Sequence, residues 1–156
     1  MIAGGSIVAG APPGPPKRPA ESAEGGAAAD RARPPRVLVV EDEYFIRVEI
    51  DAALRGAGYD VVGEATTADE AVNAAQAARP DIVIMDIRLA SRRDGVDAAI
   101  ELYRRFGMRC LFATAHADAE TRRRAEEAKP LGWLSKPFTP ESLVAAVKAA
   151  LAGLGH

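Results

Sequence analysis

The sequence predicts an α/β fold in which helices cover both faces of a five-stranded parallel sheet. Two observations lead to this prediction. From Arg36 onward, short apolar runs alternate with amphipathic segments, and such alternation is typical of parallel sheets. The first run, residues 37–40, is apolar at every position, as expected of a strand that is buried on both faces.

The strands are assigned to the apolar runs, and the helices to the segments that follow them. We expect strands at residues 37–40, 59–63, 82–85, 110–113 and 131–134. We expect helices at residues 46–57, 67–79, 94–106, 118–128 and 139–151. Five such units in about 120 residues fit a flavodoxin-like, doubly wound sheet with strand order 2-1-3-4-5.

The first two helices carry signals at their ends. Apolar residues recur at helical spacing over 46–57, and Gly58 indicates where that helix stops. Thr67 and Glu70 have the spacing of a capping box, which predicts the start of the next helix. Pro80 indicates where that second helix ends.

The later helices are recognised from their faces and caps. Residues 94–106 place apolar side chains on one face, whereas residues 118–128 are strongly charged. Thr139 is suited to the N-cap of the last helix, because Pro140 is well tolerated in a first helical turn.

Composition restricts the location and the partners. The net charge of −2 gives no reason to expect direct binding to nucleic acid or membrane, and no apolar stretch is long enough to span a bilayer. The single cysteine, Cys110, excludes an intrachain disulfide. We therefore expect a cytoplasmic protein with one domain over residues 36–154. Residues 1–35 are rich in proline, glycine and alanine, and we expect a disordered tail there, unless translation starts further downstream.

Polar residues follow four of the predicted strands. Glu41 and Asp42 follow the first, Asp86 the third, Thr114 the fourth and Lys136 the fifth. Each residue alone would be ordinary at a strand end or in a loop. In a doubly wound sheet the carboxyl ends of the strands form the functional crevice, so we expect these five side chains to converge there.

Three neighbouring carboxylates repel one another unless a cation is present, and hard oxygen ligands suit Mg²⁺. Asp42 and Asp86 are the expected direct ligands, Glu41 would act through water, and Arg88 could contribute its main-chain carbonyl. A carboxylate can attack phosphorus to form an acyl phosphate. We therefore expect Asp86 to accept a phosphoryl group whose charge Mg²⁺, Lys136 and Thr114 neutralise.

Residues 37–136 resemble the receiver domain of bacterial two-component response regulators. The resemblance is carried by Val-Leu-Val-Val-Glu-Asp-Glu at 37–43, Asp-Ile-Val-Ile-Met-Asp at 81–86, Asp-Gly at 94–95, Ala-Thr-Ala at 113–115 and Leu-Ser-Lys-Pro-Phe at 134–138. It covers about residues 36–154 and is similar to stand-alone, chemotaxis-regulator-like receivers.

The resemblance implies roles for these residues. Asp86 would be the phospho-acceptor, Glu41 and Asp42 the acidic metal pair, Thr114 the switch hydroxyl and Trp133 the switch aromatic. It also implies a cis peptide bond between Lys136 and Pro137. The implied partners are a sensor histidine kinase or phosphotransfer protein, and an unknown target on the surface of the fourth helix, fifth strand and fifth helix.

The sequence departs from the family pattern in the loop after Asp86. Residues 87–95 lack the proline found in many receivers, and the loop is about one residue longer. The aromatic at 133 is tryptophan rather than the usual tyrosine or phenylalanine, and simple core packing is an alternative role for it. The run Arg122-Arg123-Arg124 is either a solvated helix face or a specific binding element.

Other functions fit these residues less well or stay open. A phosphatase with Asp86 as transient nucleophile would need a second aspartate at the position of Arg88. A flavin-binding domain would need a phosphate loop after the first strand. A phosphate sink or shuttle, and a binding module that works without phosphorylation, stay open. We expect no activity on other substrates, so the protein is not an enzyme in the usual sense.

Overall fold

The computed structural model describes residues 33–155, and the compact unit begins at Pro35. Its strands are β2 (Arg36–Val40), β3 (Asp60–Ala65), β4 (Ile82–Met85), β5 (Cys110–Thr114) and β6 (Gly132–Ser135). Its helices are α2 (Tyr44–Gly56), α3 (Ala68–Ala78), α4 (Gly95–Phe106), α5 (Ala119–Ala125), the 3₁₀ turn η2 (Glu126–Ala128) and α6 (Pro140–Gly153). The predicted tail, residues 1–35, lies almost wholly outside the described residues.

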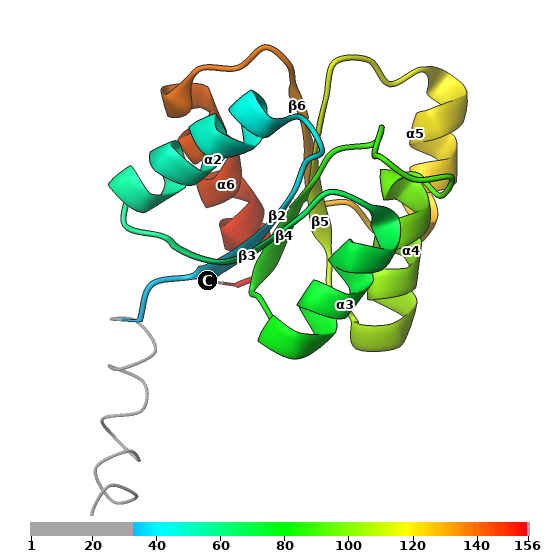
Figure 1. Ribbon diagram of the computed structural model, residues 1–156, viewed down its shortest axis with the longest axis horizontal. Coiled ribbons are helices and arrows are strands. Elements are labelled where there is room, and N and C mark those ends of the chain that lie inside the picture. The colour runs from blue at the N-terminus through cyan, green and yellow to red at the C-terminus, as the bar shows by residue number, and fades with distance from the viewer. Residues whose placement is uncertain (1–32, 156) are drawn as a thin grey trace, which may run out of the picture. The chain divides into compact units, whose positions relative to one another are not determined.

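The five strands form one parallel sheet in the order β3-β2-β4-β5-β6. Numbered along the chain, this is the predicted order 2-1-3-4-5, and the flavodoxin-like fold is confirmed. The helices α2 and α6 cover one face of the sheet, and α3, α4 and α5 cover the other (Figure 1).

Side chains alternate between the two faces along the central strands, because successive residues of a strand point to opposite sides. Leu38 and Val40 pack with α3 and α4. Val37 and Val39 pack with α2 and α6. Each face therefore has its own apolar core, and the carboxyl ends of the strands meet at one edge between the two helical layers.

Side chains cap the helices much as predicted. Thr139 and Ser142 form a capping box at α6, and Asp94 and Asp97 form one at α4. At α3 only half of the predicted box is present. Thr67 accepts from the Glu70 amide, but the Glu70 carboxylate accepts from the amide and hydroxyl of residue 66 instead.

Most predicted elements differ from the structure by one or two residues at an end, and two predictions were wrong in a way that has a physical reason. The second strand covers Asp60–Ala65 rather than 59–63, because pairing with β2 continues beyond its apolar run after a register shift opposite Val37 and Leu38. The segment predicted as one helix over 118–128 divides into α5 and the tighter turn η2. Among residues 33–155, no helix is long and apolar enough to cross a bilayer.

Candidate functional site

Three carboxylates gather at the carboxyl edge of the sheet, as the sequence predicts. One carboxyl oxygen from each of Glu41, Asp42 and Asp86 lies within 4.8 Å of the others. The backbone holds two of them in place, since the Glu41 amide donates to Ala65 at 2.9 Å and the Asp86 amide donates to Val40 at 3.0 Å. Glu41 and Asp86 are buried, whereas Asp42 is exposed.

Lys136 enters the same cluster from the residue after β6. Its Nζ lies 2.6 Å from Glu41 Oε1 and 3.4 Å from Asp86 Oδ2. Its amide donates to the Thr114 carbonyl at 2.9 Å, and the implied cis peptide bond between Lys136 and Pro137 is present. The sequence predicts an ammonium group aimed at the acceptor, but in this structure its shorter contact is with Glu41.

The environment of Asp86 disfavours its charged form. Burial and the repulsion of Glu41 raise the pKa of Asp86 to about 6, although Lys136 and the Ile87 amide act in the opposite direction. The Lys136 ammonium therefore does not offset the burial of Asp86 and the repulsion of Glu41.

The donor set fits a hard divalent cation. All three groups offer carboxylate oxygens, two are withdrawn from water, and the exposed Asp42 leaves one side open. Oxygen ligands with remaining positions for water and phosphate oxygens are the surroundings that Mg²⁺ prefers. Arg88 has an exposed side chain, and a metal contact from its carbonyl stays a prediction.

The hydroxyl of Thr114 is turned toward its own loop. Thr114 Oγ1 donates to the His116 carbonyl at 3.1 Å and accepts from the His116 amide at 3.3 Å. Its side chain is buried at the end of β5. The structure thus shows an arrangement in which this hydroxyl has backbone partners in the loop that leads to α5.

Trp133 lies on β6 as one layer of an aromatic stack. Its ring stacks on Phe112 with centroids 4.7 Å apart and an interplanar angle of 22°. The guanidinium carbon of Arg122 lies 4.4 Å from the Trp133 ring centroid. The ring is half-buried and packs against the core beneath α3 and α4, so the core-packing role that the sequence left open for Trp133 is present here.

Gly95 explains why the sequence has Asp-Gly before α4. A Cβ at this position would lie 1.8 Å from the carbonyl oxygen of Asp86, and the Gly95 amide donates to Ile87 at 2.7 Å. The first residue of α4 is therefore pressed against the backbone of the acceptor residue. Only glycine allows this close approach.

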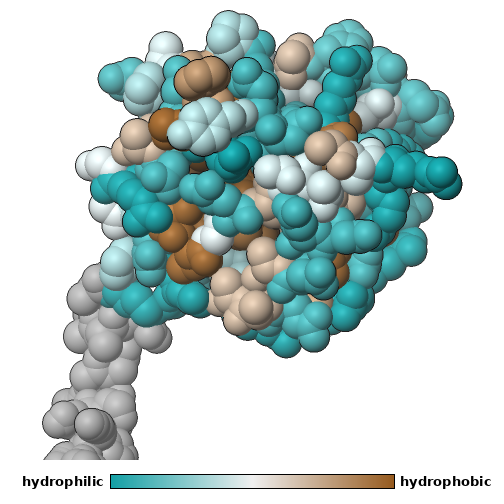
Figure 2. Space-filling view, in the orientation of Figure 1, coloured by the Kyte–Doolittle hydropathy of each residue, from teal (hydrophilic) through white to brown (hydrophobic). Residues whose placement is uncertain are grey.

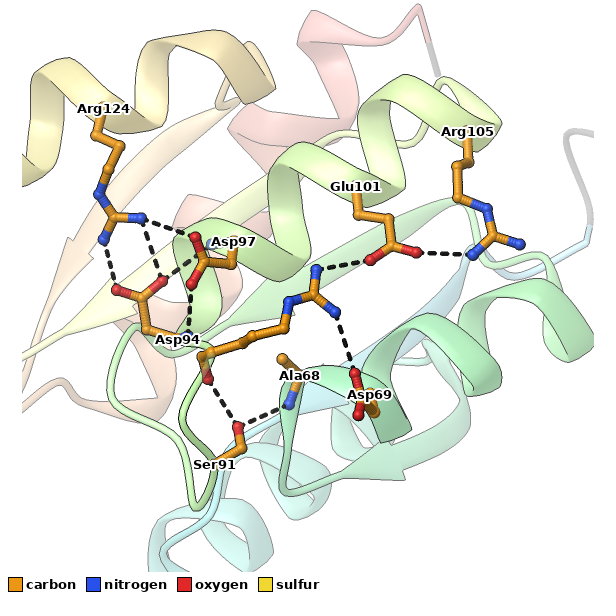
Figure 3. A network of polar contacts seen from close by, with 9 residues as sticks. Ala68, Asp69, Ser91, Asp94, Asp97, Glu101, Arg105 and Arg124 are labelled. Carbon is orange, nitrogen blue, oxygen red and sulfur yellow. Dashed lines mark hydrogen bonds and ion pairs between the residues drawn. The ribbon is translucent and has the colours of Figure 1, made fainter.

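The loop after Asp86 is fastened by polar contacts that sequence reasoning missed (Figure 3). Ser91 accepts from the Ala68 amide and donates to the carbonyl of Arg93. The Arg93 guanidinium reaches Asp69 on α3 at 3.0 Å and Glu101 on α4 at 2.6 Å. These contacts fix a loop that lacks the usual proline, and the only signal in the sequence was the arginine-rich composition of the loop.

A second arginine joins the start of α4 to α5. Figure 3 shows Arg124 reaching both carboxylates of the α4 capping box, with nitrogen–oxygen distances of 2.5 Å to Asp94 and 3.1 Å to Asp97. Burial alone would raise the pKa of Asp94, but its hydrogen bonds with Arg124 and the Asp97 amide hold it below the usual value. Arg124 therefore has a structural partner and is not simply solvated.

Hydrophilic residues cover most of the surface in Figure 2. Within residues 33–155, the exposed large hydrophobic residues are Tyr44, Phe45 and Val48, which are 61%, 73% and 45% exposed. All three lie in the first turns of α2, soon after the exposed Asp42. An apolar patch therefore adjoins the acidic cluster.

Comparison with known proteins gives a consistent result. The response regulator receiver domain family matches residues 37–148. The transcriptional regulatory protein PdtaR of Mycobacterium tuberculosis is 41% identical over 123 residues, which cover 79% of this chain and 60% of PdtaR. The phyllosphere-induced regulator PhyR of Methylorubrum extorquens is 35% identical over 125 residues, which cover 80% of this chain and 45% of PhyR. The chain thus spans about half the length of these relatives.

Solved structures show the same fold. The signal receiver domain of a modulated diguanylate cyclase from Desulfovibrio desulfuricans superposes with a TM-score of 0.72 at 34% identity, covering 79% of this chain and 99% of that one. The chemotaxis protein CheY4 of Vibrio cholerae superposes with a TM-score of 0.68 at 29% identity, covering 75% and 98%.

Proposed function

The chain belongs to the response regulator receiver domain family, and on that premise we propose that Asp86 accepts a phosphoryl group from a partner histidine kinase or phosphotransfer protein. The family is one of signalling domains rather than of classical enzymes. We assign the receiver to residues 36–154, and its cytoplasmic location stays a prediction.

The observation that carries this proposal is the convergence of Asp86, two further acids and Lys136 on one edge of the sheet. In the proposed transfer, an oxygen of Asp86 forms a bond to phosphorus while the bond from phosphorus to the donor nitrogen breaks. The electron pair of that bond stays on the departing imidazole. The product is an acyl phosphate on Asp86.

Asp42, Asp86 and, through water, Glu41 would hold Mg²⁺, with a further contact from the carbonyl of Arg88. When bound, the ion neutralises phosphoryl oxygens and lowers the cost of bringing them to the acids. Lys136 is already within 3.4 Å of the acceptor. Its ammonium can turn from Glu41 toward a phosphoryl oxygen, because it already contacts both carboxylates.

The phosphoryl group would then change the switch surface. Thr114 would exchange its contacts with His116 for the phosphoryl group, and the loop that leads to α5 would follow. The inward position of Trp133 would then be favoured, and the surface of α5, β6 and α6 that a target protein contacts would change shape. A target that prefers the altered surface shifts the population toward it.

The apolar patch of Tyr44, Phe45 and Val48 supports a protein as the phosphoryl donor. Asp42 is the exposed member of the acidic cluster and lies two residues before the start of α2, so a donor group that reaches Asp86 past Asp42 would approach this patch. Exposed aromatic residues at such a position favour contact with another protein, since they provide large apolar area at low entropic cost.

Replacement of the acceptor tests the proposal. Asp86→Asn keeps the shape of the side chain but removes the nucleophilic carboxylate, so incubation with radiolabelled acetyl phosphate and Mg²⁺ should label the wild type and leave the variant unlabelled. Asp81→Asn removes a carboxylate at the other end of β4. This variant is the matched control and should be labelled as the wild type is. Equal labelling of Asp86→Asn and the wild type would refute the acceptor assignment.

The same protein can act as an adaptor, as a phosphate sink or shuttle, or as a module that works without phosphorylation. Capture of partners with and without beryllofluoride, a mimic of the phosphoryl group, distinguishes the adaptor from the module that works without phosphorylation. Partners gained only with the mimic support an adaptor. Partners captured equally in both conditions support a phosphorylation-independent module.

A further inference from the structure

We propose that Arg47 is a positioning residue for the metal site: its guanidinium holds the peptide that joins Glu41 to Asp42 and thereby keeps the Asp42 carboxylate in place for Mg²⁺. This inference rests on the proposed function and deepens it, because it names a residue outside the acidic cluster on which metal affinity depends. An arginine offers donors and no acceptor, so Arg47 acts on the ligands and is not one of them.

The Arg47 side chain joins α2, β3 and the residue that follows β2. Its Nη1 donates to the main-chain carbonyl of Glu41 at 2.8 Å. Its Nε donates to the Glu64 carboxylate on β3 at 3.2 Å. The side chain is only 16% exposed although it carries a charge. The planar guanidinium presents its donors in a fixed fork, so the two contacts together set the position of the group.

The carbonyl that Arg47 contacts belongs to the peptide between the two neighbouring acids. A peptide unit is planar, so a held carbonyl fixes the direction in which the chain enters Asp42. The Glu41 amide is fixed as well, since it donates to the Ala65 carbonyl at 2.9 Å. The chain is therefore anchored on both sides of Glu41, by the sheet before it and by Arg47 after it.

Asp42 needs such an anchor more than the other two acids do. Glu41 and Asp86 are restrained by the packing around them, whereas Asp42 is exposed. Its carboxyl oxygen nevertheless lies within 4.8 Å of theirs, and like charges this close repel. A backbone that was free to move would let Asp42 turn away into water. Arg47 therefore supplies to Asp42 the restraint that burial supplies to the other acids.

The start of α2, which carries Arg47, is itself well fixed. The Glu43 side chain caps the helix by accepting from the Ile46 amide at 3.3 Å, and the Glu43 amide donates to Glu41 Oε2 at 3.1 Å. The Arg47 amide donates to the Glu43 carbonyl at 3.0 Å, and Ile50, in the next turn, is buried in the core. Side chains that leave a rigid helix hold a site more precisely than those that leave a loop. The guanidinium thus has a firm base.

A second arginine of α2 makes the same kinds of contact away from the site. Arg55 Nε lies 2.9 Å from Asp51, and Arg55 Nη2 donates to the Val61 carbonyl at 3.3 Å. Val61 pairs with Val37, at the opposite end of β2 from the acids. Arg55 is therefore a matched control, because it places the same group on the same helix against a carboxylate and a strand carbonyl.

The direction of the change in affinity separates positioning from simple charge. Arg47 is a cation close to the acids, so its loss would strengthen Mg²⁺ binding if only its charge mattered, because a repulsion would disappear. Loss of a positioning contact weakens binding instead. Groups that orient metal ligands contribute about ten- to a hundred-fold to metal affinity. Since Arg47 acts on the backbone of one ligand, we expect a loss at the lower end, roughly ten-fold.

The test is a calorimetric titration of the full chain with Mg²⁺ alone, which needs no phosphoryl donor. We expect Arg47→Ala to bind the ion roughly ten-fold more weakly than the wild type. Arg47→Lys keeps the charge but lacks the planar fork, so it should show a smaller loss. Arg55→Ala should match the wild type. Urea unfolding of each variant measures its folded fraction, so that the affinities refer to folded protein.

Labelling by acetyl phosphate gives a second readout, which separates the metal from the acceptor. Asp86 is held by its own strand, since its amide donates to Val40 at 3.0 Å. Saturating Mg²⁺ should therefore restore the labelling rate of Arg47→Ala to nearly that of the wild type, whereas at low Mg²⁺ the variant should be labelled more slowly.

Four outcomes decide the proposal. The expected loss in Arg47→Ala alone supports it. Unchanged or tighter Mg²⁺ binding by Arg47→Ala would overturn the positioning role, and so would equal losses in Arg47→Ala and Arg55→Ala. A wild type that binds no Mg²⁺ would overturn the metal site and the role of Arg47 with it. A wild type that binds Mg²⁺ without being labelled would overturn the acceptor proposal alone, and the Mg²⁺ titrations would still decide the role of Arg47.

Discussion

Asp86 occupies a position that disfavours its own charge. Its carboxylate is buried beside Glu41, and this raises its pKa to about 6. Lys136 reduces the penalty but is also shared with Glu41 at 2.6 Å. A cation that binds these oxygens gains the attraction of at least two carboxylates whose mutual repulsion it relieves.

Magnesium affinity should therefore depend on pH in the range where Asp86 titrates. The ion binds the ionised carboxylate, so protons compete with it below a pH of about 6. We expect the affinity to fall about ten-fold per pH unit below that value and to level off above it. Titrations followed by Trp133 fluorescence from about pH 5 to about pH 8 measure this. An affinity that stays constant over this range would contradict the assignment of Asp86 as a ligand.

At the scale of single residues, sequence reasoning identified the acids, Thr114 and Lys136 because strand ends in a parallel sheet converge by topology. It did not predict that the Lys136 ammonium would lie closest to Glu41. That preference depends on side-chain reach across the gap between two strands, which no local pattern encodes. The sequence likewise showed the Asp-Gly motif at 94–95 but not the close approach of Gly95 to the backbone of Asp86.

At the scale of elements, the strand and helix order followed from apolar runs and caps, whereas the boundaries depended on tertiary pairing. Strand β3 continues through Glu64 and Ala65 because they pair with Val39 and Val40. The fastening of the 86–94 loop also depends on distant partners, since Asp69 and Arg93 are 24 residues apart. Propensity and spacing carry no information about such contacts.

The Arg93 contacts lead to a prediction for this loop. Arg93→Ala removes the bridge between α3 and α4, and we expect faster hydrogen exchange of the Ala90 amide, which donates to Thr66. Because the pair with Asp69 is exposed to solvent and the pair with Glu101 is only partly buried, global stability should fall by no more than about 1 kcal/mol. Exchange mass spectrometry and urea unfolding measure the two effects. Arg92→Ala, an exposed neighbour, is the control, and equal exchange in both variants would show that the bridge does not order the loop.

At the scale of the whole molecule, one apolar core lies on each face of the sheet, and the site lies at the carboxyl edge of the sheet between the two helical layers. The strands that lead to Glu41 and Asp86 are packed on both faces, so the acids cannot separate without disturbing the sheet. Repulsion between them is thus a cost to the folded state, and the fold tolerates it because the cores on both sides are continuous.

The burial of Asp86, together with its repulsion of Glu41, should appear as a pH-dependent difference in stability between the wild type and Asp86→Asn without Mg²⁺. The pKa of Asp86 is about 6 in the folded state and 3.8 is its ordinary value. The folded state therefore binds the proton more tightly, and the stability that this proton contributes is present below pH 3.8 and is lost as pH rises through about 6. The asparagine side chain of the variant does not titrate. As the pH rises between these limits, the free energy of unfolding of Asp86→Asn should therefore increase by about 2 kcal/mol relative to that of the wild type, after allowance for solvent screening.

Urea unfolding of both proteins from about pH 4 to about pH 7.5, in the presence of a chelator, measures this difference. Millimolar Mg²⁺ should then reverse it, because the ion binds the folded wild type and stabilises it by mass action, while Asp86→Asn lacks one carboxylate ligand. A constant difference across the pH range would show that Asp86 is not the group whose ionisation strains the fold. An equal response of both proteins to Mg²⁺ would place the ion away from Asp86.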